Sequence, residues 1–141
     1  MSTMTVELAW KNGKRFEGTN SWGHEIVVDA ASESGGEESG LKPTELLLYG
    51  VAGCTGMDIV GILQKKRQKL TSLMITVEGD QQESYPRPFH EVRVHYVATG
   101  EDLDEKALAK AIELSEGKYC VVSQTVQRET RVTTSYEIVE A

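Results

Sequence analysis

Cysteine is scarce in this chain, and the common metal- and nucleotide-binding motifs are missing from it. Cys54 and Cys120 are the only two cysteines among 141 residues, and they are too far apart to form a Cys-x-x-Cys motif. The sequence also lacks a His-Glu-x-x-His motif and a glycine-rich loop ending in Lys-Ser or Lys-Thr. We therefore expect neither a zinc-finger or zincin site nor a phosphate-binding P-loop.

Histidine is scarce as well, and the three histidines are dispersed at His24, His90 and His95. His90 and His95 have opposite parity along a predicted strand, so their side chains point to opposite faces and cannot share an ion unaided. His90 shares the apolar face of that strand, which favours a hydrogen-bonded core histidine. The sequence predicts no metal and no resident cofactor.

Clustered positive charge is nearly absent. The net charge is −7, and the acidic residues are scattered along the chain. This balance argues against nucleic acid as a partner, because phosphate contacts require clustered Lys and Arg. One basic cluster closes a predicted helix, where positive charge complements the helix dipole. It consists of Lys65, Lys66, Arg67 and Lys69.

A leader or membrane-spanning segment is not evident. The first ten residues have no apolar stretch flanked by positive charge, and the longest apolar run is interrupted by Gly, Thr and Asp. We therefore expect no membrane partner and a cytoplasmic location. Thiols are kept reduced there, so a disulfide would be transient and catalytic rather than structural.

The periodicity predicts a single domain, 1–141, of the α+β class. Strands are expected in groups that are separated from a long central helix, which does not fit a doubly wound parallel sheet. The Asn12-Gly13 pair predicts a hairpin turn between the first two strands. The expected strands cover residues 4–10, 14–18, 25–29, 73–77, 90–96 and 132–138. The expected helices are 43–69, one that starts at Asp102 or Asp104 and ends at Gly117, and a short piece from 120.

The central helix has apolar residues nearly all round between Leu46 and Leu63. Such a helix is expected to be buried on every side. Gly50, Gly53 and Gly56 recur every third residue, and each weakens a helix by ~1 kcal/mol relative to Ala. We expect these glycines to permit close approach of another backbone.

A Gly/Ser/Glu-rich segment from Ser32 to Gly40 has no hydrophobic period and is predicted to be a flexible loop. Two interpretations stay open for it. It is a lid over a functional site or a disordered connector, since loops of this kind are usually one or the other.

The two thiols are the best candidates for chemistry. Cys54 falls about three turns into the central helix, too deep for the helix dipole to activate it, so a cation must come from elsewhere. Arg15 is the only early arginine; Arg67, Arg87, Arg93, Arg128 and Arg131 are its rivals. Glu45 lies ~13 Å from Cys54 along the helix axis, so it could hold an arginine in place without touching the sulfur. The alternative is an inert, buried thiol that merely packs.

Two segments resemble the OsmC/Ohr family of thiol-dependent hydroperoxide reductases and their uncharacterised relatives. The first runs from Pro43-Thr44-Glu45-Leu46 through Gly53-Cys54-Thr55-Gly56-Met57-Asp58, and the second is Glu116-Gly117-Lys118-Tyr119-Cys120-Val121-Val122. The spacing of 66 residues between the thiols is similar to the family's as well.

The resemblance implies an OsmC-like fold in an intertwined homodimer, with antiparallel curved sheets wrapped around the central helices and a site at the dimer interface. It implies that Cys54 attacks a small organic hydroperoxide and that Cys120 resolves the product as a disulfide. An external dithiol or lipoyl-type reductant would then restore both thiols. Arg15 and Glu45 would be the activating pair.

The sequence departs from the family's peroxidase branches at Thr44. Those branches have a glutamate directly after the proline, whereas here Glu45 comes one residue later. A shift of one residue rotates a helical side chain by ~100°. The chain thus resembles the less characterised OsmC-like branch. The alternative function is a non-catalytic protein that binds a small hydrophobic ligand at the dimer interface.

Overall fold

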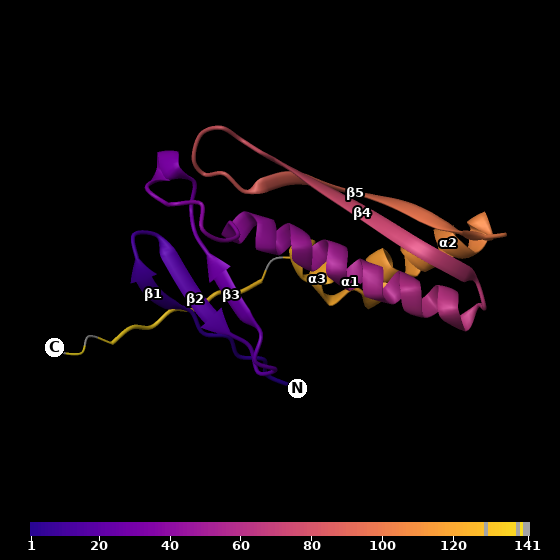
Figure 1. Ribbon diagram of the computed structural model, residues 1–141, viewed down its shortest axis with the longest axis horizontal. Helices are drawn as coiled ribbons and strands as arrows, with labels where there is room; N and C mark the ends of the chain where they lie inside the picture. The colour runs from indigo at the N-terminus through magenta and orange to yellow at the C-terminus, as the bar shows by residue number, and fades with distance from the viewer. Residues whose placement is uncertain (129, 138, 140–141) are drawn as a thin grey trace. The chain divides into compact units, whose positions relative to one another are not determined.

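The computed structural model describes residues 1–128, 130–137 and 139 and divides the chain into two compact units, Met1–Gly50 and Val51–Ala141. Strands and helices occupy separate stretches, which confirms the predicted α+β class. The elements labelled in Figure 1 follow this order: β1 (Ala9–Asn12), β2 (Arg15–Thr19), β3 (Glu25–Val28), α1 (Pro43–Lys65), β4 (Lys69–Gln81), β5 (Phe89–Glu101), α2 (Glu105–Leu114) and α3 (Val121–Val126).

The first unit is built on a three-stranded antiparallel sheet with the order β1-β2-β3. The predicted hairpin joins β1 and β2, but its turn residues are Gly13 and Lys14, because Asn12 is the last residue of β1 and pairs with Arg15. Gly13 takes a positive φ of 50°, which glycine adopts readily. The indole N–H of Trp10 donates to the carbonyl of Gly13 at 3.0 Å and closes the turn. The Asn-Gly signal thus located the hairpin to within one residue, and the return strand begins at Arg15 rather than at Lys14.

The Gly/Ser/Glu-rich loop is fastened by one carboxylate. Asp29, only 4% exposed, accepts hydrogen bonds from the backbone N–H groups of Ala30, Glu37 and Ser39 and from the Ser39 hydroxyl. The loop also contains a short 3₁₀ turn, Ser32–Ser34. The expectation of a loop without internal structure is thus corrected, because Asp29 supplies the acceptors that its backbone needs.

Helix α1 begins at Pro43, where a missing N–H costs nothing. Its fully buried residues recur every fourth position, at Val51, Thr55, Ile59 and Leu63. The prediction of burial on all sides is wrong for the single chain, because Met57 is 78% exposed. By length and composition alone α1 could cross a membrane, a test that the core helices of soluble proteins also pass.

The second unit contains the rest of α1, the β4–β5 hairpin, α2 and α3. The hairpin pairs 13-residue strands in antiparallel register, and it lies along α1 in Figure 1. Leu73, Ile75 and Val77 alternate toward the interior, as predicted. Ile59 and Leu63 of α1 join residues of α2 and both strands in the core. The other members are Ala107, Ala111, Ile62, Leu70, Leu73, Tyr96, Leu108 and Ile112.

Helix α2 starts after Asp104, whose carboxylate accepts the N–H of Lys106 at 3.0 Å. Of the two residues at which the helix was expected to start, Asp102 and Asp104, the structure uses Asp104. The helix then widens into a π-helical turn, Ser115–Tyr119, which ends at Cys120. The short α3 follows at once, so a single irregular turn fixes where the Cys120 side chain points.

Two expected strands are corrected at the chain ends. The first strand is only Ala9–Asn12, and Met4 is 93% exposed. The last strand, expected from Val132 to Ile138, is absent from residues 130–137, and Ile138 lies outside the described residues. An alternating pattern forms a strand only where a neighbouring strand supplies hydrogen bonds.

Candidate functional site

Cys54 and Asp58 lie one turn apart on α1, so their side chains project from the same face of the helix. Both are partly buried. The hydroxyl of Ser115 donates to the Asp58 carboxylate at 2.9 Å and ties the π-helical turn to α1. Ser115 is fully buried, so this hydrogen bond fixes the orientation of the carboxylate.

Cys120 caps the start of α3 with its sulfur. The Sγ atom accepts the backbone N–H of Ser123 at 3.3 Å, and the N–H of Cys120 donates to the Ser115 carbonyl at 2.8 Å. The residue is 0% exposed, whereas Cys54 is partly exposed. Solvent therefore reaches the pair from the Cys54 side.

Folding brings the two thiols together although they are 66 positions apart in the sequence. The Sγ atoms of Cys54 and Cys120 and a carboxylate oxygen of Asp58 all lie within 4.8 Å of one another. Both thiols are free in this structure. A disulfide has its two sulfurs about 2.0 Å apart, so these side chains would have to approach each other further before they could join.

The environment of Cys54 raises the pKa of its thiol. Burial is the main cause, and the neighbouring thiol of Cys120 acts in the same direction. The backbone N–H groups of Val121 and Val122 point toward the sulfur and oppose the increase. Because burial dominates, a Cys54 thiolate requires stabilisation beyond these two N–H groups.

A second polar group lies beside the thiols. The Tyr96 hydroxyl donates to the Glu116 carboxylate at 2.9 Å and contacts Thr55. Burial raises the pKa of Tyr96 to about 12, with Glu116 adding to the effect, so the phenol stays protonated at every physiological pH. Tyr96 therefore serves as a hydrogen-bond donor on the strand side of the site.

The predicted activating pair lies in the first unit, whereas both cysteines lie in the second. Arg15, on β2, forms an ion pair with Glu17 at 2.8 Å. Glu45, in the first turn of α1, accepts the backbone N–H of Lys42 at 3.0 Å. Their action on Cys54 stays a prediction.

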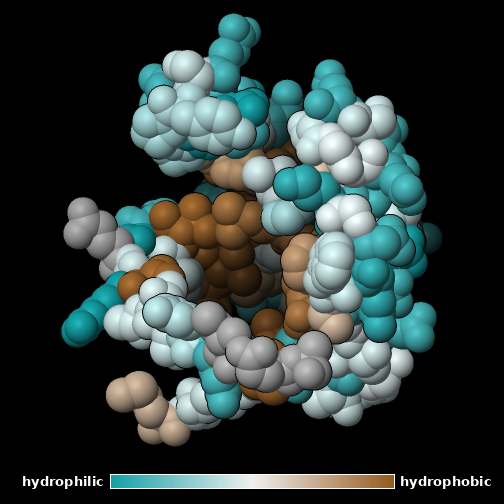
Figure 2. Space-filling view, turned by 90° about the vertical axis from the view of Figure 1, so that its left-hand side faces the viewer, coloured by the Kyte–Doolittle hydropathy of each residue, from teal (hydrophilic) through white to brown (hydrophobic). Residues whose placement is uncertain are grey.

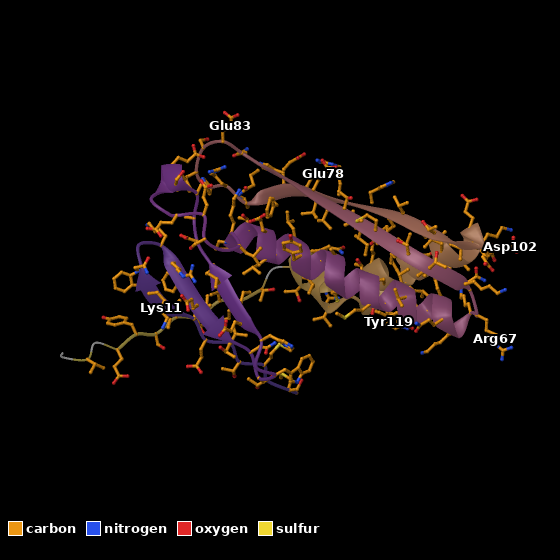
Figure 3. The ribbon with its side chains drawn as sticks, in the orientation of Figure 1. Lys11, Arg67, Glu78, Glu83, Asp102 and Tyr119 are labelled. Carbon is orange, nitrogen blue, oxygen red and sulfur yellow. The ribbon has the colours of Figure 1, made fainter. Side chains whose placement is uncertain are left out.

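Several rival arginines of the second unit have other partners. Arg93 binds Asp80 through two hydrogen bonds, and Arg87 donates to the carbonyl of Gln82. Arg128 contacts Gln124. Figure 3 shows Arg67 beyond the end of α1, about three turns from Cys54.

The second unit also contains a pocket of about 430 Å³. His90, from the strand face that the sequence singled out, contributes to its wall. His90 is exposed, so the interpretation as a core histidine is corrected. The remaining wall residues are Val51, Phe89, Glu91, Val92, Val94, Glu116, Ser123, Val126 and Gln127.

Sequence reasoning missed Asp58, Ser115 and Tyr96. The sequence could have indicated Asp58. It lies four residues after Cys54 in a predicted helix, so the two side chains share one face of that helix. Ser115 and Tyr96 carried no comparable signal. Their positions depend on the π-helical turn and on the register of β5, which only tertiary structure reveals.

Residues 35–135 match the OsmC-like protein family. The chain belongs to this family. Protein YhfA of Escherichia coli K12 is 35% identical over 138 residues, which cover 98% of this chain and 100% of YhfA. The family assignment confirms the resemblance seen in the sequence.

Solved structures share the fold of this chain. A hypothetical protein from Aquifex aeolicus is 38% identical, with a TM-score of 0.79 over 90% of this chain and 89% of that chain. An organic hydroperoxide resistance protein, OsmC, from Legionella pneumophila is 17% identical, with a TM-score of 0.63 over 90% and 92% of the two chains. The predicted OsmC-like fold is thereby confirmed for the single chain.

Proposed function

We propose that this OsmC-like protein is a cysteine peroxidase that reduces small organic hydroperoxides to alcohols. The observation that carries the proposal is the juxtaposition of Cys54 and Cys120, whose sulfurs lie within 4.8 Å of each other although they come from distant segments. Cys54 is the attacking thiol because it is the more exposed of the two. Cys120 is the resolving thiol.

The chemistry proceeds in three balanced steps. The Cys54 thiolate attacks the terminal oxygen of ROOH, the O–O bond breaks, and the alkoxide takes a proton to leave as ROH. Cys54 is then a sulfenic acid. The Cys120 thiol displaces its hydroxyl as water and forms a disulfide. An external dithiol, of the lipoyl or a related type, reduces that disulfide and is itself oxidised.

The first step requires a cation near Cys54, because burial raises the pKa of this thiol. Arg15, supported by Glu45, is the proposed source of that charge. A guanidinium close to the sulfur would favour the thiolate and stabilise the departing alkoxide. We place the reaction in the cytoplasm, where dithiol reductants are available.

The proposed assembly is a homodimer. Large hydrophobic side chains reach the surface of the single chain, and Figure 2 shows hydrophobic residues open on the face that it displays. An apolar groove of about 620 Å³ follows α1 and includes Gly53, Gly56 and Met57. The small residues there would allow a second helix to approach closely.

Peroxide turnover tests the function. Purified protein, a lipoyl or other dithiol reductant and cumene hydroperoxide should yield cumyl alcohol at a rate that Cys54→Ser abolishes. Arg15→Ala should slow turnover and shift the Cys54 alkylation profile to higher pH, whereas the hairpin-tip variant Arg87→Ala should do neither. Equal turnover by wild type and Cys54→Ser would refute the proposal.

The α1 groove favours one alternative, a carrier of a small hydrophobic ligand at the dimer interface. The groove is lined almost entirely by apolar residues, and it contains neither thiol. In this case, native mass spectrometry of the purified protein should detect a bound apolar molecule, and Met57→Lys should release it. The peroxidase assay would then show no dependence on Cys54.

A further inference from the structure

We propose that Cys54, Asp58 and Cys120 form a binding site for a thiophilic divalent cation, with zinc as its occupant. The sequence predicted no metal, because the chain lacks Cys-x-x-Cys and His-Glu-x-x-His motifs and its histidines are dispersed. The three residues come together only through the fold. The proposal does not depend on peroxidase activity.

The donor atoms are nearly in place for tetrahedral coordination. Zinc binds thiolate sulfur at about 2.3 Å, so two sulfurs on one ion lie about 3.8 Å apart. A carboxylate oxygen at about 2.1 Å lies about 3.6 Å from each of them. The three donors here lie within 4.8 Å of one another, so movements of about 1 Å or less would complete the geometry.

The donor set suits zinc and its soft congeners. Two thiols and one carboxylate would supply three negative charges once deprotonated, and thiolates select thiophilic ions over Mg²⁺ or Ca²⁺. Three protein ligands leave a fourth position for water. Cys54 is partly exposed, so that position and the entry path lie on its side of the site.

Asp58 and Cys120 each accept a hydrogen bond from an outer group. Ser115 donates to Asp58 at 2.9 Å, and the N–H of Ser123 donates to the Cys120 sulfur at 3.3 Å. The N–H groups of Val121 and Val122 point toward the Cys54 sulfur. Outer hydrogen bonds of this kind orient metal ligands and stabilise thiolates. In this arrangement, α1 carries two of the donors, and the turn that leads into α3 carries the third.

Metal binding and thiol oxidation would exclude each other. Both use the same sulfur lone pairs, so a bound zinc ion protects Cys54 and Cys120 from peroxide, and a disulfide between them removes two of the three ligands. The ion would thus act as a reversible block on the thiols. This consequence, unlike the site itself, is relevant to activity only if the proposed peroxidase function holds.

Cadmium titration of the reduced, chelator-treated full chain tests the site directly. Thiolate-to-cadmium charge transfer should produce an ultraviolet band that saturates at one ion per chain. Cys54→Ser and Cys120→Ser should each remove about half of the band or more. Asp58→Asn should weaken zinc affinity, measured by competition with a colorimetric chelator, by at least about tenfold.

Matched controls separate this site from surface binding. Asp102→Asn changes an exposed carboxylate at the far end of the hairpin (Figure 3) and should leave affinity unchanged. Ser115→Ala keeps all three donors, so it tests the site even if a cysteine variant fails to fold, and it should weaken affinity severalfold. Absence of the band in folded wild type, or an undiminished band in Cys54→Ser, would overturn the proposal. No peroxide is used, so failure here is distinct from failure of the peroxidase.

Discussion

The neighbouring thiol of Cys120 and the burial of the site both act on Cys54. Each of them raises the pKa of the Cys54 thiol, so removing Cys120 should lower it. We predict that Cys120→Ala shifts the pH profile of Cys54 alkylation to lower pH, because alkylation requires the thiolate. Mass spectrometry after timed iodoacetamide treatment, with a chelator present, measures that profile. An unchanged profile in the folded variant would mean that the thiols do not interact.

Asp29 is a second residue whose pKa the fold changes. Hydrogen bonds from Ser39 and Ala30 lower the pKa of its carboxyl group from 3.8 to about 2. Between about pH 4 and pH 2, the Asp29 carboxyl group is protonated in the unfolded chain but still ionised in the folded chain. The stabilisation is therefore complete above about pH 4 and is lost as the pH falls toward 2. Wild type should exceed Asp29→Asn in free energy of unfolding at neutral pH. That gap should narrow between pH 4 and 2 in urea titrations, and a constant gap would contradict the assignment.

Single residues differ in how far the sequence foretells their roles. Cys54 and Cys120 were candidates because thiols are rare in the chain and chemically distinct. Asp58 shares a helical face with Cys54, so periodicity alone could have found it. Ser115 could not be found in that way, since its contact with Asp58 spans 57 positions and depends on a π-helical turn.

At the scale of elements, α1 packs against the rest of the second unit through one row of buried residues. Ile59 is 0% exposed and lies in the core formed with α2 and the hairpin. Ile59→Ala should lower the free energy of unfolding by about 2–5 kcal/mol, because it removes buried methyl groups and leaves a cavity. Lys65→Ala, at an exposed position of the same helix, should change it by less than about 0.5 kcal/mol. Urea unfolding followed by circular dichroism measures both.

Elements with local signals were predicted well. The β1–β2 hairpin near Gly13, Pro43 at the start of α1 and Asp104 at the start of α2 each depend on interactions within a few residues. The terminal strands were not predicted well. An alternation of apolar and polar residues indicates which side chains share a face, but it does not show that a neighbouring strand is present to pair with. Val132 and Tyr136 keep the alternating pattern yet are 81% and 91% exposed.

At the scale of the whole molecule, the exposed apolar surface is the feature to be explained. Met57 projects from α1 at 78% exposure and contributes to the apolar groove. If a second copy covers the groove, Met57→Lys should convert the dimer to a monomer in analytical ultracentrifugation, since an unpaired charge would be buried. Met74→Lys, at a methionine of β4 that is 64% exposed, should remain dimeric. A monomeric wild type would remove the basis for the homodimer.

Family membership could be predicted from the sequence, because two motifs with a characteristic separation carry it. Assembly is harder to predict from one chain. The apolar periphery of α1 indicated burial, and the structure shows that the chain itself covers only one side of the helix. The pattern thus marks an apolar face of α1 without saying whether another molecule covers it.

Cys120 begins α3 with a sulfur in the place usually taken by a hydroxyl or carboxylate. If Cys120 is the resolving thiol proposed above, the start of α3 depends on the redox state of its sulfur. The Cys120 sulfur accepts the Ser123 N–H, and oxidation would change this sulfur as an acceptor. The stability of the first turn of α3 should therefore change with the redox state. Amide hydrogen exchange at that turn would then report the oxidation of a thiol that solvent cannot reach.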